Sequence, residues 1–378
     1  HYAKLRNYDH GPGSHSDVSH LSPYIRRRIL TEKDVIRATL GRHSRQASEK
    51  FIQEVFWRTY WKGWLEMRPS VWATYQNDLG RISNQLATQS GLRQRWEEAC
   101  LGHTGIDCFD VWAVELAETG YLHNHARMWF ASIWIFTLRL PWQLGADFFL
   151  RHLLDGDPAS NTLSWRWVAG LQTVGKIYLA RASNISKYTD GRFFPKGLAQ
   201  EAVPITEERY HPKLLPVSET EYAETAPSLL FLHDEDSHLA PMANEFKTIL
   251  GAVRVSTVGQ ITPFEISDNI AQFVDDLMQE QDERWSGQFG SITSLNSVNG
   301  IVDEAVRIGA KQIISPYAAV GPAQDMQYKL QELVASSDIS IVRYLSAYDR
   351  MCWPRATQGF FRFKEHIPKF IQALGFQA

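Results

Sequence analysis

The chain has 378 residues, of which 44% are hydrophobic and 21% charged, and its formal net charge is −3. This size gives room for two domains with cores of their own, and no apolar run is long enough to cross a membrane. The three cysteines, Cys100, Cys108 and Cys352, are widely spaced, which argues against a disulfide framework and a cysteine-only metal site. We therefore expect a cytoplasmic protein with no bound metal, and a monomer by default.

Charge and tryptophan are distributed unevenly. Residues 1–200 hold 25 Lys and Arg against 18 Asp and Glu, a net of +7, whereas residues 201–378 hold 14 against 24, a net of −10. Eleven of the thirteen tryptophans lie before residue 200. Basic charge mixed with aromatic rings suits a polyanionic partner with stackable bases, although aromatic residues more often simply fill a core.

The first stretch, residues 1–20, is polar and marked by Gly and Pro, which predicts an extended lead-in. A helix is expected to begin at Ser22, with Pro23 at its first position. The hydroxyls of Ser19 and Ser22 and the N–H groups of this helix start are suited to a phosphate. Capping explains Ser22 equally well.

A second helix is predicted over about residues 48–66. Within it Glu54, Trp57, Arg58 and Trp61 follow an i, i+3, i+4, i+7 spacing and share one face. Because this face carries an acid, a guanidinium and two indoles, it favours a pocket wall over a plain core stripe. For Arg58 alone, a solvated surface position is the ordinary alternative.

Residues 67–103 are predicted to form irregular structure and short helices, and two helices broken at Thr119–Gly120 follow. In the second of these, Asn124, Arg127 and Met128 share a face. A guanidinium on an otherwise apolar helix needs a partner, and Asp155 is the expected one. His123 and His125 flank Asn124 and would point apart, which argues against a shared metal.

The segment DGDPASNTLSWRW, residues 155–167, opens as a tight turn, because Asp155 and Asp157 flank a glycine and a proline follows. Trp165 and Trp167 are two residues apart and would point in different directions on a helix. One interpretation is a cofactor site that includes Asn161. The other is a loop with a capping aspartate and two core tryptophans.

The second half changes in pattern. A linker rich in Pro, Glu and Thr precedes strands predicted at 228–233, 252–258, 291–296, 312–317 and 339–344, with helical stretches between them. This alternation predicts a three-layer α/β domain with a mainly parallel sheet after an all-helical domain. The predicted boundaries are 1–198 for the helical domain, 199–226 for the linker and 227–378 for the α/β domain. No GxGxxG or Walker loop marks a nucleotide site in it.

Several of these motifs occur together in one order: SHLSPY, EVFWR, TGYLHNHARM and DGDPASNTLSWRW. In this order they resemble the FAD-binding helical domain of the photolyase/cryptochrome family, over more than half of the chain. The resemblance implies FAD as cofactor. It implies the following FAD-binding residues: Tyr2, Ser19, Leu21, Ser22, Arg58, Asn124, Arg127, Asp155, Asp157, Asn161 and Trp165.

The resemblance further implies light-driven electron transfer from reduced FAD to a flipped-out pyrimidine dimer in DNA, with repair of the cyclobutane type. The residues implied to contact the dimer are Glu54, Asn124, Met128, Trp57 and Trp167, with His125 at a phosphate-contacting position. Trp165 and Trp142 match the first two members of the family's tryptophan electron-transfer chain. The third has no counterpart near Leu86, so either another residue or route serves, or photoreduction is weak.

Two departures leave alternatives open. His125 replaces an arginine that contacts substrate phosphate, so a blue-light photoreceptor of cryptochrome type and a nucleic-acid-binding flavoprotein without repair activity both remain. The α/β domain follows the helical one, whereas the family's antenna domain precedes it. We expect a circularly permuted antenna-like domain, with an unrelated domain as the alternative, and the sequence assigns no antenna chromophore.

Overall fold

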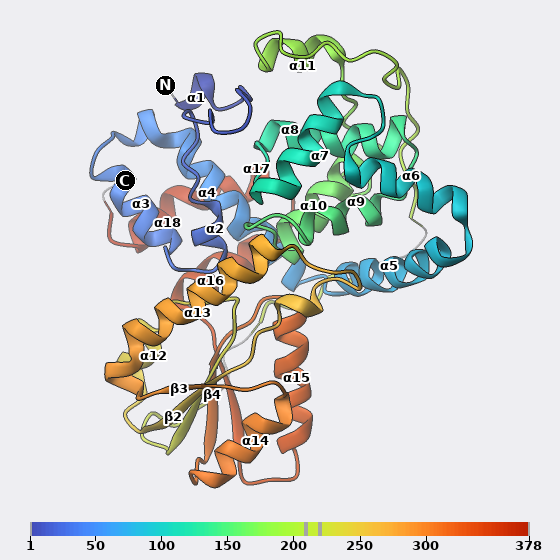
Figure 1. Ribbon diagram of the computed structural model, residues 1–378. Coiled ribbons are helices and arrows are strands. Elements are labelled where there is room, and N and C mark those ends of the chain that lie inside the picture. The colour runs from blue at the N-terminus through green and yellow to red at the C-terminus, as the bar shows by residue number, and fades with distance from the viewer. Residues whose placement is uncertain (1, 208–210, 218–220, 377–378) are drawn as a thin grey trace. The chain divides into compact units, whose positions relative to one another are not determined.

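The computed structural model describes residues 2–207, 211–217 and 221–376 (Figure 1). Its backbone contacts group into two compact units, and each unit is made of separate pieces of the chain. The first unit comprises residues 1–22, 70–212 and 262–270, and the second comprises 23–69, 213–261 and 271–378. This grouping differs from the boundaries expected at 198 and 227, which stay a prediction.

The first unit is helical. Its elements are α1 (Tyr2–Leu5), α5 (Ser70–Thr88), α6 (Ser90–Leu101), α7 (Asp107–Thr119), α8 (Asn124–Ser132), η1 (Ile133–Thr137), α9 (Trp142–Leu150), α10 (Pro158–Val168) and α11 (Ala182–Tyr188). The expectation of irregular structure over 67–103 is wrong, because α5 and α6 fill this range. Buried positions of α5, including Val71, Tyr75 and Leu79, recur at helical spacing, so tertiary burial explains the long helix.

The predicted break at Thr119–Gly120 is confirmed. Gly120 ends α7 in the left-handed conformation, with φ of +67°, and its N–H donates to the carbonyl of Leu116. A Cβ atom at this position would lie 2.7 Å from the Leu154 side chain, so space and backbone both require glycine. The turn sends the chain directly into α8.

The core of the first unit is unusually rich in indole rings. Trp112, Trp129, Trp134 and Trp165 are all less than 3% exposed. Gly145 on α9 makes room for two of them, because a Cβ atom there would lie 2.3 Å from Trp165 and 2.9 Å from Trp134. The glycine therefore lets the α9 backbone pack directly on the Trp165 ring.

The second unit contains a five-stranded parallel sheet in the order β3-β2-β1-β4-β5. Its strands are β1 (Ser228–Leu232), β2 (Ile249–Arg254), β3 (Ile292–Ser294), β4 (Gln312–Pro316) and β5 (Ser340–Tyr344). All five were predicted within a few residues. The central strand β1 is buried along its whole length, as a strand covered on both faces must be.

Helices cover both faces of this sheet (Figure 1). On one face α14 (Val298–Arg307) and α15 (Pro322–Val334) supply Ile301, Met326 and Leu330 to the core. On the other face α12 (Ala240–Glu245) and α13 (Asp268–Phe289) supply Met242 and Phe289. The predicted fold class, a helical part followed by a three-layer α/β part, is therefore confirmed.

The same unit has helical pieces from both ends of the chain. They are α2 (Ser22–Arg26), α3 (Glu32–Leu40), α4 (Arg45–Glu66), α16 (Ala347–Cys352), α17 (Phe360–Phe363) and α18 (Ile367–Ala373), with short 3₁₀ turns η2 (Val258–Gln260), η3 (Trp353–Arg355) and η4 (Lys364–His366). The fully buried Phe56 of α4 contacts the rings of Phe363 and Phe370, which anchors the C-terminal segment on α4.

Three consecutive arginines meet three consecutive acids after β1. Arg26 donates two hydrogen bonds to Glu235, Arg27 pairs with Asp234, and Arg28 pairs with Asp236. In an open parallel sheet, ligands bind outside the carboxyl ends of the strands at the point where strand order reverses. In this unit that position, after β1, carries the chain's own buried ion pairs.

None of the described helices has the length and apolar character that a membrane span requires.

Candidate functional site

The predicted ion pair on α8 is present. Two nitrogens of the Arg127 guanidinium donate to the two carboxylate oxygens of Asp155 at 2.9 and 3.2 Å, and Nε donates to the Leu122 carbonyl at 2.8 Å. The Asp155 side chain is 6% exposed and the Arg127 side chain 22%. A bidentate, mostly buried pair holds the guanidinium in one orientation, with a positive charge fixed inside the helical unit.

Asp157 serves as a helix cap. One carboxylate oxygen accepts the N–H groups of Ala159 and Ser160 at 2.9 Å each, and the other accepts the Ser160 hydroxyl at 2.5 Å. Pro158 then occupies the first turn of α10. The capping interpretation of this aspartate is thus confirmed, and its role at a cofactor stays a prediction.

One turn into α10, the amide nitrogen of Asn161 donates to the Ala146 carbonyl of α9 at 2.8 Å. The side chain is buried. Two further buried polar atoms of α10, Thr162 Oγ1 and Trp165 Nε1, lack a hydrogen-bond partner within the described residues. Buried polar atoms without partners are uncommon in native proteins, and a bound polar group is one explanation.

The two tryptophans of α10 point apart, as predicted. Trp165 is buried and lies edge-on to Phe149 at 5.1 Å, whereas Trp167 is half-buried and stacks on Tyr178 at 5.6 Å. Trp142, which begins α9, is 5% exposed.

A row of aromatic rings continues from Trp142 into α5. Its ring centroid lies 5.6 Å from that of Tyr75, which lies 5.2 Å from Trp72. The Tyr75 hydroxyl is buried without a hydrogen-bond partner among the described residues, and burial raises its pKa well above 10. Sequence reasoning missed both residues, because it took this range as irregular. The spacing of Trp72 and Tyr75 at i and i+3 could have indicated them.

Asn124 and Met128 lie one turn apart on α8, as expected, the first exposed and the second half-buried. His125 between them stacks on Trp129 at 4.2 Å, and its Nδ1 lies 3.1 Å from the Asn7 carbonyl. Burial lowers the pKa of His125 below its ordinary value, which favours the neutral ring.

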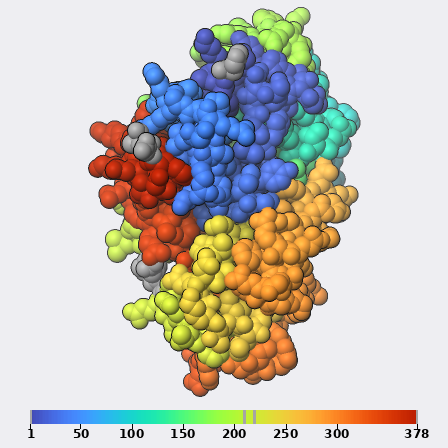
Figure 2. All heavy atoms as spheres, turned by 90° about the vertical axis from the view of Figure 1, so that its left-hand side faces the viewer, coloured from blue at the N-terminus to red at the C-terminus, as the bar shows by residue number. Residues whose placement is uncertain are grey.

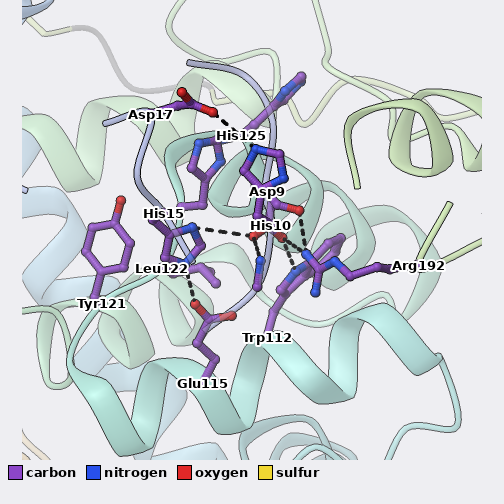
Figure 3. A network of polar contacts seen from close by, with 12 residues as sticks. Asp9, His10, His15, Asp17, Trp112, Glu115, Tyr121, Leu122, His125 and Arg192 are labelled. Atoms are coloured by element: carbon purple, nitrogen blue, oxygen red, sulfur yellow. Dashed lines mark hydrogen bonds and ion pairs between the residues drawn. The ribbon is translucent and has the colours of Figure 1, made fainter. Parts of the chain in front are cut away.

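The expected lead-in before Ser22 is not a loose extension. It places Asp9, fully buried, where one carboxylate oxygen accepts the Trp112 indole N–H at 3.0 Å and pairs with Arg192 at 3.1 Å. His15 Nε2 lies 2.9 Å from Glu115 Oε1 of α7 (Figure 3). Two buried carboxylates and an imidazole thus fix this segment on the helical unit.

Four predicted FAD-binding residues belong to this N-terminal segment. Tyr2 lies on α1, and Ser19 is exposed, whereas Leu21 and Ser22 are half-buried. The helix that starts at Ser22 has only five residues. What fixes the segment is the Asp9 and His15 network rather than the helix start.

The remaining predicted residues, Glu54, Trp57 and Arg58, lie on α4 in the second unit and are half-buried. The Trp57 indole stacks on Phe360 of α17, with centroids 3.6 Å apart and an interplanar angle of 12°. One face of this indole is therefore covered by the C-terminal segment, so the predicted pocket wall is in part a packing surface.

Sequence reasoning also missed Asp9, His15 and Glu115. Glu115 lies between Val114 and Leu116 in the stretch VWAVELA, where an acid among apolar residues needs a partner if it is buried, and this was the available signal. Asp9 and His15 gave a weaker signal, because a polar Gly-rich segment usually indicates an exposed loop.

This chemistry is compatible with FAD. The Arg127 cation can favour negative charge on a flavin, Asn161 supplies an amide, and Thr162 and Trp165 supply buried polar atoms. The described residues contain no group of three or more His, Cys, Asp or Glu side chains placed to hold a metal ion.

Residues 51–195 match the model of the family described as "FAD binding domain of DNA photolyase". The chain is 30% identical over 175 residues to a deoxyribodipyrimidine photo-lyase of Streptomyces griseus, covering 45% of this chain and 36% of that protein. It is 31% identical over 176 residues to the corresponding Thermus thermophilus protein, covering 45% and 38%. A Synechocystis cryptochrome structure covers 50% of this chain and 39% of its own, with 22% identity and a TM-score of 0.42.

The chain therefore spans a little over a third of the length of these two curated relatives. The match to the family model covers residues 51–195 of the helical domain expected at 1–198, and it ends before the parallel sheet.

Proposed function

We propose that this chain repairs cyclobutane pyrimidine dimers in DNA with light, because residues 51–195 match the FAD-binding domain of DNA photolyase. Bound FAD, once reduced and excited, would supply the electron that splits the dimer. The chain's own residues bind the flavin and hold the extruded dimer. Relatives named deoxyribodipyrimidine photo-lyase support this proposal.

The observation that carries the proposal is the bidentate pair of Arg127 and Asp155. A fixed guanidinium lowers the free energy of a nearby anion, and the anionic reduced flavin is the electron donor that repair requires. Asn161 and Trp165 on α10 lie in the same matched segment, with buried polar groups suited to the cofactor.

For the substrate, we propose that Glu54, Asn124 and Met128 contact the dimer. An extruded base is read by hydrogen bonds to its polar edge and by stacking on its faces. Glu54 and Asn124 offer the polar contacts, and Trp57 and Trp167 offer ring faces.

The test is illumination of the purified, FAD-reduced protein with blue light in the presence of DNA that contains a cyclobutane thymine dimer. We expect the thymine absorbance to recover as the dimer splits. No recovery from protein that holds photoreducible FAD would refute the repair function.

Replacement of Glu54 with alanine should lower the repair rate while FAD content stays unchanged, since we assign Glu54 to the substrate. Loss of a positioned polar or acid–base group commonly costs on the order of 10²-fold in rate. Glu49→Ala is the matched control, because Glu49 is an exposed acid of the same helix. Unchanged repair by Glu54→Ala would contradict the substrate assignment.

Tyr75 and Trp72 are the proposed continuation of the electron route from Trp142, in place of the tryptophan missing near Leu86. We expect Tyr75→Phe and Trp72→Phe to slow photoreduction of bound flavin severalfold. Each change replaces a ring of this row with a phenylalanine ring, which is harder to oxidise. The measurement is flavin absorbance under blue light at equal FAD content. Trp96→Phe is the control, since Trp96 contacts Phe264 in the same unit. Equal rates in all four proteins would exclude this route.

A cryptochrome-type photoreceptor is the second candidate, and the stacking of Trp57 on Phe360 favours it. An indole with one face covered offers less surface to a dimer. Photoreducible FAD without repair would support this candidate. DNA binding without photoreduction of FAD and without repair would support a non-repairing flavoprotein.

A further inference from the structure

We propose that the C-terminal segment, residues 347–376, binds the phosphodiester backbone of a nucleic acid strand through a basic hollow. This inference rests on the proposed function only in taking nucleic acid as the partner. It concerns a surface outside the stretch that matches the FAD-binding family, since that match ends at residue 195.

The first observation is charge. Residues 347–378 hold five Lys and Arg against two Asp and Glu, a net of +3. Residues 201–346 hold 9 against 22, a net of −13, because 14 − 5 = 9 and 24 − 2 = 22. A basic segment thus follows the strongly acidic α/β part, and such a reversal marks a surface that attracts polyanions.

The second observation is the hollow itself, a surface depression of about 330 Å³. It is lined by Arg355, Thr357, Gln358, Arg362, Glu365 and His366. Two guanidiniums, a hydroxyl, an amide and an imidazole are hydrogen-bond donors that phosphate oxygens accept, and guanidinium binds phosphate with two parallel bonds. Glu365 is the one acidic side chain of this lining.

The third observation is a rigid base beneath these donors. Phe360 and Phe363 are buried against Trp57 and Phe56 of α4, so the turns that carry the donors rest on packed rings. The Arg68 guanidinium also donates to the Thr357 carbonyl at 3.1 Å. The segment, red in Figure 2, lies at the molecular surface.

An exposed ring accompanies the charge. The Phe361 side chain is 74% exposed, and Lys364 Nζ lies 5.1 Å from its ring centroid. Cations beside an exposed aromatic ring are the combination that binds single strands, where phosphates meet the cations and a base stacks on the ring. Because Arg362 is 72% exposed at its side chain, the hollow suits a passing polymer better than an enclosed small molecule.

The ion pair within the hollow offers a variant that is expected to strengthen binding, whereas the arginine variants weaken it. Arg362 Nη1 lies 3.3 Å from Glu365 Oε1, and both side chains are mostly exposed. Such a pair stabilises the fold by little, so either member can change without unfolding the segment. Without the Glu365 charge, the Arg362 guanidinium no longer has this ion-pair partner and can bind a phosphate instead.

The test measures binding of an undamaged single-stranded DNA oligonucleotide in the dark, by fluorescence anisotropy over a range of salt. Arg355→Gln/Arg362→Gln should weaken binding about tenfold at moderate salt and reduce the slope of log K against log salt by about 1.4, at roughly 0.7 per lost contact. Glu365→Gln should strengthen binding. An RNA oligonucleotide of equal length tests whether the backbone alone is read.

Arg307→Gln is the matched control, because Arg307 is 70% exposed and forms the same i, i+3 type of pair with Glu304. The inference is overturned if the double variant binds like the wild type or like Arg307→Gln, or if Glu365→Gln weakens binding. Repair of dimer-containing DNA by the same variants is scored separately. Its absence in the wild-type protein would refute the proposed function and leave this binding result intact.

Discussion

Asp9→Ala should lower the free energy of unfolding by about 3–5 kcal/mol, the usual cost of removing one partner of a buried charge pair. Asp9 is fully buried, and its carboxylate accepts the Trp112 indole N–H and the Gly11 N–H and pairs with Arg192. After the change, the fully buried Trp112 N–H loses its acceptor and Arg192 loses its counter-charge. Denaturant unfolding at pH 7 measures the loss.

Asp17→Ala is the control for this change. Asp17 lies on the same segment, but its pair with His10 is partly exposed, with side-chain exposures of 24% and 29%. An exposed pair contributes about 0–1 kcal/mol, so the control should unfold almost like the wild type. Equal effects of the two changes would mean that Asp9 does not anchor the segment.

The Asp9 variant also bears on FAD. The segment it anchors includes Tyr2, Ser19, Leu21 and Ser22, which we propose to bind the cofactor. We therefore expect reduced FAD content in Asp9→Ala at temperatures where the protein is still folded.

The sequence was most informative where local rules and burial agree. The five strands were found because each is a short apolar run bounded by turn residues, and β1 and β4 are buried along their length. The break at Gly120 was found because a left-handed helix end needs glycine. The pair of Arg127 and Asp155 was found because a guanidinium on an apolar helix has few ways to be satisfied.

Contacts between residues far apart in the chain, and the burial that they cause, could not be predicted from the sequence. α5 was missed because its buried face alternates with Gln, Asn and Ser, and propensity alone does not show that a core covers Tyr75 and Leu79. The Asp9 network joins residues about a hundred positions apart, such as His15 and Glu115. The stacking of Trp57 on Phe360 joins positions 57 and 360, and no local pattern on α4 indicates which ring will cover it.

The candidate site was predicted more from the order of the motifs, which carries the family resemblance, than from spacing and burial. Spacing placed Asn124, Arg127 and Met128 on one face, but only the resemblance connected them with α10 and the N-terminal segment. The interpretation of the α/β domain as a circularly permuted antenna-like domain stays a prediction, since the family match ends before the sheet.

The stability of the second unit should depend on pH through Glu66, the last residue of α4. Its carboxylate is buried and accepts hydrogen bonds from the Tyr317 hydroxyl at 2.7 Å and the Val320 N–H at 2.6 Å. Burial disfavours the charged carboxylate, whereas these two hydrogen bonds and a third from Gln324 favour it. The effect of burial is the larger, and it raises the pKa of Glu66 from 4.5 to about 7.

Because the pKa is higher in the folded state, the folded protein binds this proton more tightly than the unfolded chain does. The resulting stabilisation is complete below pH 4.5 and is lost as pH rises through 7. A difference of 2.5 units, from 7 − 4.5, corresponds to about 3 kcal/mol in total, of which about 2–3 kcal/mol falls between pH 5 and 8.

Glu66→Gln should remove this dependence. The amide oxygen can accept from Val320 while the amide nitrogen donates to the Tyr317 oxygen, so the shape and two of the hydrogen bonds are kept without a titrating group. Unfolding free energies of the two proteins at pH 5 and pH 8 give the result by difference, which cancels other groups such as His123, whose pKa burial lowers to about 4. Parallel pH profiles would show that Glu66 stays charged throughout, held by its three donors.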